Sequence, residues 1–523
     1  MVHSLLLLLA LCVQPLLALD LTVDLGYSKY QGTDRGNGIY RWAGMRYARS
    51  VSRVNGMRFA APQDPIAEGG VKDAREFGPL CIATDSDLKS EFGEQQSEDC
   101  LFVNVFAPAK ASSTSNLPVY VFIQGGGFNS NSNANFDGST LIRDADMDMV
   151  VVNFNYRVGP YGFLASQEIA SDTSTSLNNG LKDQRQLLKW VQDHIREFGG
   201  DPGRVTLGGA SAGAGAVVLQ LTAFGGRDDK LFIAATAESQ AFPPIRNVSE
   251  SQFQYDLLLE KTGCKDLKCL REMDAVTFQK AVKSIRAPFP GAKNPPIWFY
   301  NPTLDNDFIK DYTYNEIKAR HFVNVPTIFG DSTNEGIIFT PNEINSLAKA
   351  EQFVSDQFTT LGAQQNAKIT PLFNGPSNTE NDPEWKKAAA DVFGSVRYIC
   401  PGLNISAAYA ESGTPTWQYR WDVGSANHVG ELGSVWNNGT SAADVFIHTY
   451  FTSFIRSSDP NKLKTDFFGN GGKIASPTWE QFGKGNGQRM LFDDDNVVRM
   501  ETVSDEQHKK CGVISGLGVS LKQ

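Results

Sequence analysis

Short apolar segments recur along the chain and favour β-strands. Val, Ile, Leu, Phe and Trp are prominent in them, without a regular polar alternation. Apolar strands of this kind are typical of a parallel sheet that is buried on both faces. The clearest segments are 119–123, 149–154, 205–207, 232–236, 326–329 and 417–421.

The segments between these strands show the periodicity of helices. Residues 183–198 place Leu187, Leu188, Val191 and Ile195 near one helical stripe, and the segment 199–202 with its glycines and proline ends the helix. Longer helical insertions are expected at 251–319 and 344–408. Since neither repeats nor a linker rich in Pro, Gly or Ser divide the chain, we predict one domain over residues 19–523. Its expected fold is α/β, a large and mostly parallel central sheet with helices on both faces.

The composition excludes several classes of protein. The chain has 523 residues, 41% of them hydrophobic, which is enough for a large core and argues against disordered or fibrous proteins. Its formal net charge is −10, and no basic run, zinc-ligand spacing or RNA-binding motif occurs. We therefore expect no nucleic-acid partner.

The longest apolar stretch lies at the start of the chain. Leu5 to Leu17 fits the apolar region of a secretory signal peptide and is too short to cross a bilayer, although no Lys or Arg precedes it. We predict a signal peptide over residues 1–18, a secreted protein and no transmembrane segment in the mature chain. The six cysteines that remain are an even set, so three disulfides are expected. Sequons at Asn247, Asn404 and Asn438 agree with export.

A candidate nucleophile lies between a short strand and an Ala-rich helix. Gly209-Ala-Ser-Ala-Gly213 is a G-x-S-x-G motif with Ser211 at its centre. In a nucleophile elbow the strand turns so sharply into the helix that larger neighbours of the serine would collide. The positions beside Ser211 are all Gly or Ala, which predicts an elbow. The simpler alternative is a tight turn whose serine caps the helix.

An acyl-transfer serine also needs donors for the oxyanion. The segment 121–128 is an apolar strand followed by three consecutive glycines, whose backbone can approach a substrate oxygen. The amides of Gly126 and Gly127, together with that of Ala212 beside the nucleophile, are the predicted oxyanion hole.

The general base is expected to be His428. In α/β-hydrolases the chain order is nucleophile, acid, histidine, and His428 follows both Ser211 and the strand at 417–421. His448 lies in an apolar helical run and is predicted to be a core residue. The other histidines fit less well because they precede the acid or lie in a charged tail: His194, His321 and His508.

The acid is expected in the loop 330–336, which follows a strand and contains two carboxylates. Asp331 and Glu335 are nearly equivalent by spacing alone. The role of the acid is to hold the histidine tautomer and to stabilise the imidazolium.

Several stretches together resemble the type-B carboxylesterase and cholinesterase family, which includes secreted fungal lipases. Ser97-Glu-Asp-Cys-Leu is similar to the family's E-D-C-L signature, and similar matches cover most of the mature chain. The other matching stretches are 38–48, 155–163, 179–184 and 198–202.

The resemblance implies an α/β-hydrolase fold and selects Glu335 as the acid, because the family's acid is the Glu of a Glu-Gly pair. It implies a catalytic set of Ser211, Glu335 and His428, with an oxyanion hole at Gly126, Gly127 and Ala212. It also implies three disulfide pairs: Cys81 with Cys100, Cys264 with Cys269, and Cys400 with Cys511.

Some positions depart from the family pattern. Ala210 stands where relatives usually carry Glu, and Gln124 where many have His or Tyr. The loop between Cys81 and Cys100 lacks the Trp that binds quaternary ammonium in cholinesterases, so choline esters are not favoured. The same loop is short, which argues against a large lipase lid.

The expected function is a secreted serine carboxylester hydrolase that forms an acyl-enzyme on Ser211 without a metal or organic cofactor. Its substrate is expected to be a small-molecule ester, with lipid and aromatic esters as candidates. A triacylglycerol lipase of the same family is the alternative. A non-catalytic adhesion protein of the family is less favoured because the catalytic set is intact.

Overall fold

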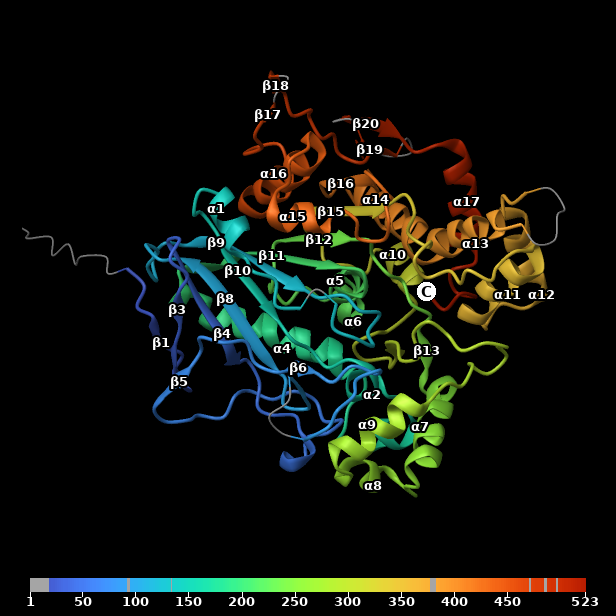
Figure 1. Ribbon diagram of the computed structural model, residues 1–523, viewed down its shortest axis with the longest axis horizontal. Helices are drawn as coiled ribbons and strands as arrows, with labels where there is room; N and C mark the ends of the chain where they lie inside the picture. Colours follow the sequence, from blue (N-terminus) through green and yellow to red (C-terminus); the bar gives the residue numbers. More distant parts are fainter. Residues whose placement is uncertain are drawn as a thin grey trace, which may run out of the picture.

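The computed structural model of this chain describes residues 18–91, 95–132, 134–376, 382–469, 472–483, 487–494 and 497–523. The predicted signal peptide lies outside the described residues except for Ala18. A large sheet runs through the molecule with helices on both of its faces (Figure 1).

The central sheet has eleven strands within the described residues. Neighbouring strands run parallel from β10 to β19, and antiparallel strands complete both edges, so the predicted mostly parallel sheet is confirmed. In spatial order the strands are β20 (Val498–Thr502), β19 (Gln488–Asp493), β16 (Thr416–Asp422), β15 (Thr327–Ser332), β12 (Ala234–Glu238), β11 (Gly200–Ala210), β9 (Leu117–Ile123), β10 (Val150–Phe154), β8 (Phe102–Pro108), β4 (Ile39–Arg46) and β3 (Thr33–Asp34).

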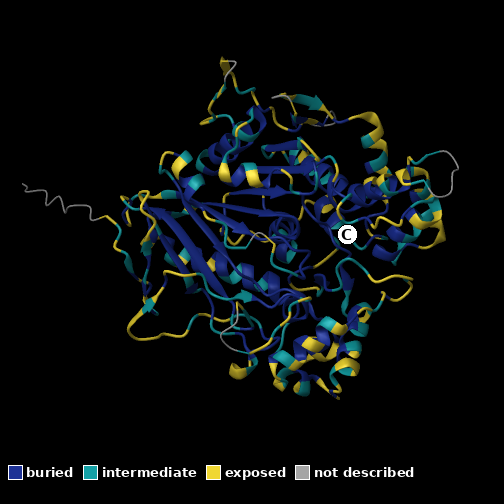
Figure 2. Ribbon diagram, viewed as in Figure 1, coloured by how far each residue is buried: buried dark blue, intermediate teal, exposed yellow. Residues whose placement is uncertain are grey.

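Successive side chains of the inner strands enter different hydrophobic clusters. Val119 and Val121 of β9 pack with helices α4 (Asn179–His194) and α5 (Ala212–Leu221). Tyr120 and Phe122 pack instead with α1 (Ser139–Asp144), α15 (Leu432–Asn437) and α16 (Ala442–Ser457). Because side chains alternate along a strand, β9 is apolar at every position. Figure 2 shows the inner strands mostly buried.

Both predicted insertions are helical (Figure 1). The first contains α7 (Val248–Thr262), α8 (Leu267–Glu272), α9 (Ala275–Ser284) and α10 (Thr313–Ala319). The second contains α11 (Leu347–Gln357), α12 (Ala363–Ile369), α13 (Glu384–Gly394), the π-helical turn η4 (Ser395–Ile399) and α14 (Cys400–Ser412). Helix α17 (Asp505–Gly516) packs on α14 and η4.

Element boundaries differ from the sequence pattern at two places beside the site. The strand expected at 326–329 is β15 and extends to Ser332, so Asp331 belongs to the strand and not to the loop expected at 330–336. The apolar run predicted a strand at 232–236, whereas β12 spans Ala234–Glu238. Phe232 is buried in the core although it precedes the strand, so the apolar run in the sequence begins two residues before β12 does. The strand therefore ends on Glu238, a buried carboxyl beside the nucleophile.

No described helix is both long enough and apolar enough to cross a membrane.

Candidate active site

Ser211 occupies a strained turn between β11 and α5. Its backbone angles are φ 58° and ψ −122°, a combination that non-glycine residues rarely adopt, and its amide donates a hydrogen bond to the Glu238 carbonyl at 2.8 Å. The geometry is that of a nucleophile elbow, in which the serine side chain is displayed at the carboxyl ends of the parallel strands.

The glycines beside this turn allow close backbone approach. A Cβ atom on Gly209 would lie 2.6 Å from the carbonyl carbon of Gly213, and one on Gly213 would lie 2.1 Å from the carbonyl oxygen of Ile123. Backbone atoms cannot yield as a flexible side chain does, so larger residues are excluded at both positions. The structure thus supplies the steric reason for the small residues of the motif.

His428 lies between Ser211 and Glu335. Its Nε2 atom is 2.8 Å from Ser211 Oγ, and its Nδ1 atom faces Glu335 Oε2 within hydrogen-bonding distance. The other carboxylate oxygen, Glu335 Oε1, accepts the Ser332 amide at 2.7 Å. All three catalytic candidates are buried or nearly so, and a polar chain of this kind is strengthened where water is excluded.

Two loops are joined where His428 meets the acid. Asn334, one residue before Glu335, donates its amide to the Ala426 carbonyl at 2.9 Å, and its Nδ2 donates to the Ser425 carbonyl at 2.8 Å. These bonds fix the separation of the histidine and acid loops, so the imidazole and carboxylate are held in register.

Aromatic rings enclose the other sides of the imidazole. The ring centroids of Tyr398 and His428 are 4.4 Å apart, and those of Phe339 and His428 are 5.1 Å apart. Tyr398 comes from η4 in the second helical insertion. No local sequence motif marks this contact, which arises only when the insertion folds back over the sheet.

Asp331 does not reach His428. Its Oδ2 accepts from Gln418 Nε2 at 2.9 Å, and its Oδ1 lies 3.6 Å from Arg489 Nη1. Burial raises the pKa of Asp331 to about 7. Of the two carboxylates that spacing left open, the structure brings only Glu335 to the histidine.

The remaining histidines lie away from this set. His448 is buried in α16 with Nδ1 2.8 Å from the Val435 carbonyl, as a core residue would be. His321 pairs with Glu316, His194 packs against Tyr27, and His508 is exposed in α17.

The glycine loop after β9 has little room for side chains. Gly126 and Gly127 have φ angles of 113° and 61°. A Cβ on Gly126 would lie 2.1 Å from the Ser130 carbonyl oxygen, and one on Gly127 would lie 1.8 Å from Trp298 Nε1. Neither amide donates a hydrogen bond to another described residue. Ala212 is the first residue of α5, where helical amides lack acceptors within the helix.

Two buried carboxyls near the catalytic set were not predicted from the sequence. Glu238 and Glu431 are both fully buried, and burial raises the pKa of each, to about 7 for Glu431. Glu431 receives hydrogen bonds from Tyr419 and from Ser332 Oγ. The sequence places Glu431 only three residues after His428, but this proximity alone does not show that its carboxyl is buried near the catalytic set.

The six cysteines are joined as the resemblance implies. Three disulfides link Cys81 with Cys100, Cys264 with Cys269, and Cys400 with Cys511.

The three sequons differ in their surroundings. Asn247 caps α7 and Asn404 lies within α14, and both are half-buried. Asn438 ends α15 and donates through Nδ2 to Asp144 Oδ2 at 3.2 Å.

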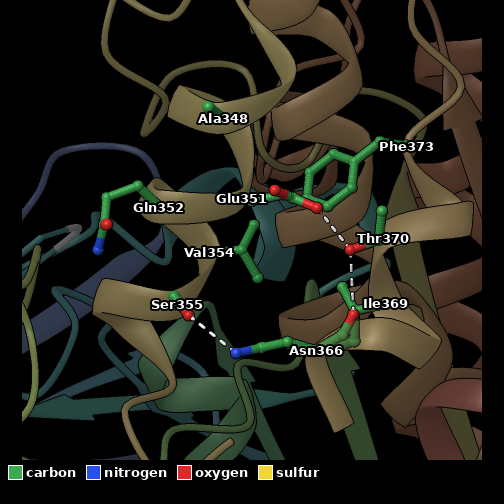
Figure 3. A pocket seen from close by; sticks show the side chains of 9 residues that line it. All are labelled: Ala348, Glu351, Gln352, Val354, Ser355, Asn366, Ile369, Thr370 and Phe373. Carbon is green, nitrogen blue, oxygen red and sulfur yellow. Dashed lines mark hydrogen bonds between the residues drawn. The ribbon is translucent and has the colours of Figure 1, made fainter. Parts of the chain in front are cut away.

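A cavity of about 260 Å³ lies between α11 and α12, away from the catalytic set (Figure 3). Its polar groups bind one another: Thr370 donates to Glu351, and Asn366 donates to Ser355. None of the predicted catalytic side chains lines it. Elsewhere in the described part of the chain, no group of three His, Cys, Asp or Glu side chains has the arrangement of a metal site.

Comparison with known proteins gives a consistent result. A family model described as "Carboxylesterase family" matches residues 21–511. Secreted lipase 4 of Gibberella zeae is 29% identical, covering 83% of this chain and 84% of its own length. Para-nitrobenzyl esterase of Bacillus subtilis is 30% identical, covering 79% of this chain and 82% of its own.

Among solved structures, Aspergillus niger EstA superimposes with a TM-score of 0.88 and 35% sequence identity. The match covers 96% of this chain and 99% of that one. The α/β-hydrolase fold implied by the sequence motifs is thereby confirmed over nearly the whole chain.

Proposed function

The chain belongs to the carboxylesterase family and is a carboxylic ester hydrolase, and we propose that Ser211 is its nucleophile, with His428 as general base and Glu335 as the acid. The proposal rests above all on one contact, the 2.8 Å between Ser211 Oγ and His428 Nε2 at a strained elbow. A serine that merely capped a helix would need neither the strain nor the histidine.

Acylation begins when Ser211 Oγ attacks the ester carbonyl and His428 Nε2 takes the hydroxyl proton. The carbonyl electron pair moves onto the oxygen, where the amides of Gly126, Gly127 and Ala212 stabilise the oxyanion. The intermediate collapses, the bond to the alcohol oxygen breaks, and His428 returns the proton to the departing alcohol.

Deacylation repeats the sequence with water. His428 removes a proton from a water molecule as it attacks the acyl-enzyme carbonyl, and the proton is then given to Ser211 Oγ as the acid leaves. No step requires a metal or an organic cofactor.

Glu335 acts by orientation and charge. Its Oε1 is held by the Ser332 amide, which leaves Oε2 to accept from His428 Nδ1. This fixes the tautomer that presents an unprotonated Nε2 to Ser211, and the carboxylate stabilises the imidazolium that forms during each step.

The substrate is proposed to be a small-molecule ester, with lipid and aromatic esters among the candidates. The short loop between Cys81 and Cys100 favours an esterase over a lipase with a large lid, and its lack of Trp disfavours choline esters. A triacylglycerol lipase is the second candidate because one relative of this chain, from Gibberella zeae, is named a secreted triacylglycerol lipase.

We also propose that the chain is secreted and forms one catalytic domain over residues 19–523. The apolar start, the disulfides and the sequons at Asn247, Asn404 and Asn438 support export. The Nδ2 atom of Asn438 would have to leave Asp144 before a glycan could be attached.

The test is hydrolysis of p-nitrophenyl esters from acetate to palmitate by the secreted protein and its Ser211→Ala variant. The proposal expects activity in the wild type and none above background in the variant. Highest activity on short chains would indicate an esterase, and a sharp rise on emulsified long chains a lipase. A folded wild type that hydrolyses none of them, and that takes no label from an organophosphonate, would overturn the assignment of Ser211.

A further inference from the structure

Arg397 is a buried cation with unfilled donors. It lies in the π-helical turn η4 with only 3% of its surface exposed. Its Nε and Nη2 atoms are buried and have no acceptor among the described residues. A buried guanidinium normally has its N–H groups bonded, because an unpaired buried charge is costly.

Glu335 of the catalytic set and Asp391, the acidic residue that precedes η4 in the sequence, are bonded to groups other than Arg397. Glu335 is held by His428 and Ser332, and Asp391, which precedes η4 on α13, pairs with Lys510. Within the described residues no acidic side chain forms an ion pair with Arg397, whereas several other buried arginines have one; Arg157, for example, is paired with Asp183.

The stacking contact of Arg397 covers the face of the guanidinium and leaves Nε and Nη2 without acceptors. The guanidinium carbon lies 4.2 Å above the centre of the Trp298 ring. Such stacking attracts the charge through the π-system, but the five N–H bonds of a guanidinium point outward in its own plane. Stacking therefore positions the fork without supplying an acceptor.

The same neighbours tie Arg397 to the catalytic set. Trp298 lies directly against Gly127 of the proposed oxyanion loop. Tyr398 lies against His428, with its ring centre 4.4 Å from the centre of the His428 ring. The same Tyr398 ring centre is 6.0 Å from the guanidinium carbon of Arg397. The guanidinium is thus at most about 10 Å from the imidazole. This separation is comparable to the length of an acyl or alkyl chain of a few carbons.

The local backbone is consistent with a functional position. A π-helical turn inserts an extra residue into an otherwise α-helical path and is frequent at functional sites. Here the turn joins α13 to α14 and brings Arg397 and Tyr398 to the buried side together.

We propose that Arg397 binds a carboxylate of the substrate, so that this hydrolase prefers esters that carry an anionic group a few carbons from the scissile bond. The inference rests on the proposed function, since it places the second group of the same substrate. Bidentate pairing with carboxylate is the interaction for which the guanidinium fork is suited.

The test compares matched pairs of esters. 4-Nitrophenyl hydrogen adipate places a carboxylate on the acyl side, and 4-nitrophenyl hexanoate is its neutral counterpart. 4-Carboxyphenyl hexanoate places the carboxylate on the alcohol side, with phenyl hexanoate as its counterpart. The proposal expects kcat/KM for one anionic ester to exceed that of its neutral partner, and the pair that shows the preference identifies the side.

Arg397→Met removes the charge at similar volume, and Arg397→Lys keeps the charge without the fork. The preference for the anionic ester should fall at least about thirtyfold in Arg397→Met, as expected for loss of a buried charge partner, and in part in Arg397→Lys. Free adipate should also inhibit hexanoate hydrolysis competitively in the wild type and lose this effect in Arg397→Met.

The outcomes separate this inference from the proposed function. A wild-type protein that shows no hydrolysis dependent on Ser211 would overturn the proposed function itself. Ser211-dependent hydrolysis with no preference for either anionic ester, or a preference that Arg397→Met leaves intact, would overturn the role of Arg397 alone. If the Met variant fails to fold, Arg397→Lys carries both comparisons: a partial loss of the preference and weaker adipate inhibition are expected, and wild-type values for both would overturn the role of Arg397.

Discussion

Asp331 lies near the end of β15 and Glu335 follows the last residue of that strand by three positions, yet their carboxylates meet different partners. Glu335 joins His428 and the Ser332 amide, whereas Asp331 lies beside Gln418 and Arg489. The two acids therefore have different hydrogen-bond partners, and separate substitutions can test their roles.

Glu335→Gln should reduce kcat/KM far more than Asp331→Asn. Gln keeps the shape but cannot stabilise the imidazolium, and it can donate to Nδ1 and favour the wrong tautomer, so a loss of roughly 10²- to 10⁴-fold is expected. Asp331→Asn leaves the contacts of His428 intact and should cost much less. Steady-state rates with one p-nitrophenyl ester measure both, and the reverse ranking would move the acid to Asp331.

Asp331 should make stability depend on pH in a defined direction. Burial raises its pKa from 3.8 to about 7. Between these values the folded protein keeps the proton and the unfolded chain has lost it, so the free energy of unfolding falls as pH rises through this window. For one group the slope approaches about 1.4 kcal/mol per pH unit, and it levels off above about pH 7.

Urea unfolding of the wild type and Asp331→Asn from pH 5 to 8 checks this expectation. Asn does not titrate, so the variant should gain stability relative to the wild type with each step up to neutrality. Glu506→Gln, at an exposed position of α17, is the control and should run parallel to the wild type. Parallel curves for Asp331→Asn would contradict the shifted pKa.

The sequence predicted those features that depend on neighbouring residues in the chain. Ser211 was recognisable because steric crowding restricts its neighbours, and β9 because a strand covered on both faces is apolar throughout. Spacing could not separate Asp331 from Glu335, because the choice depends on which carboxyl reaches a loop far along the chain. The family resemblance, not the pattern, selected Glu335.

The residues that sequence reasoning missed are those brought in by distant segments. Arg397 and Tyr398 lie in a helical insertion whose local pattern is that of an ordinary buried helix, and only the fold sets Tyr398 against His428. Trp298 likewise reaches Gly127 from a loop of the other insertion. Contacts of this kind leave no periodic signal.

Gly127→Ala should impair catalysis more than folding. The added Cβ would meet Trp298 Nε1 at 1.8 Å, and the backbone has a φ of 61°, so the loop must shift. Displacing one oxyanion donor costs about 10²- to 10³-fold in kcat. Steady-state assays measure the change in kcat, and thermal melting of the same variant checks that it is folded.

Gly433→Ala provides the matched control. Gly433 lies on the exposed side of α15, has no atom within 4 Å of the added Cβ, and should keep the wild-type kcat. Wild-type kcat in Gly127→Ala would remove the glycine loop from the oxyanion hole.

Arg157 and Asp183 form the buried pair that we expect to matter most for stability. Arg157 donates from Nε and Nη2 to both carboxylate oxygens at 2.8 and 2.7 Å, its amide reaches the same carboxylate at 3.1 Å, and Nη1 donates to the Ala60 carbonyl at 2.8 Å. Asp183→Asn leaves the guanidinium buried without its counter-charge, which should lower the free energy of unfolding by about 3–5 kcal/mol. Asp73→Asn, which breaks the exposed pair with Arg75, should cause no resolvable change because water screens those charges. Urea denaturation at constant pH compares the two variants, and equal midpoints would show that the buried pair contributes no more than the exposed one.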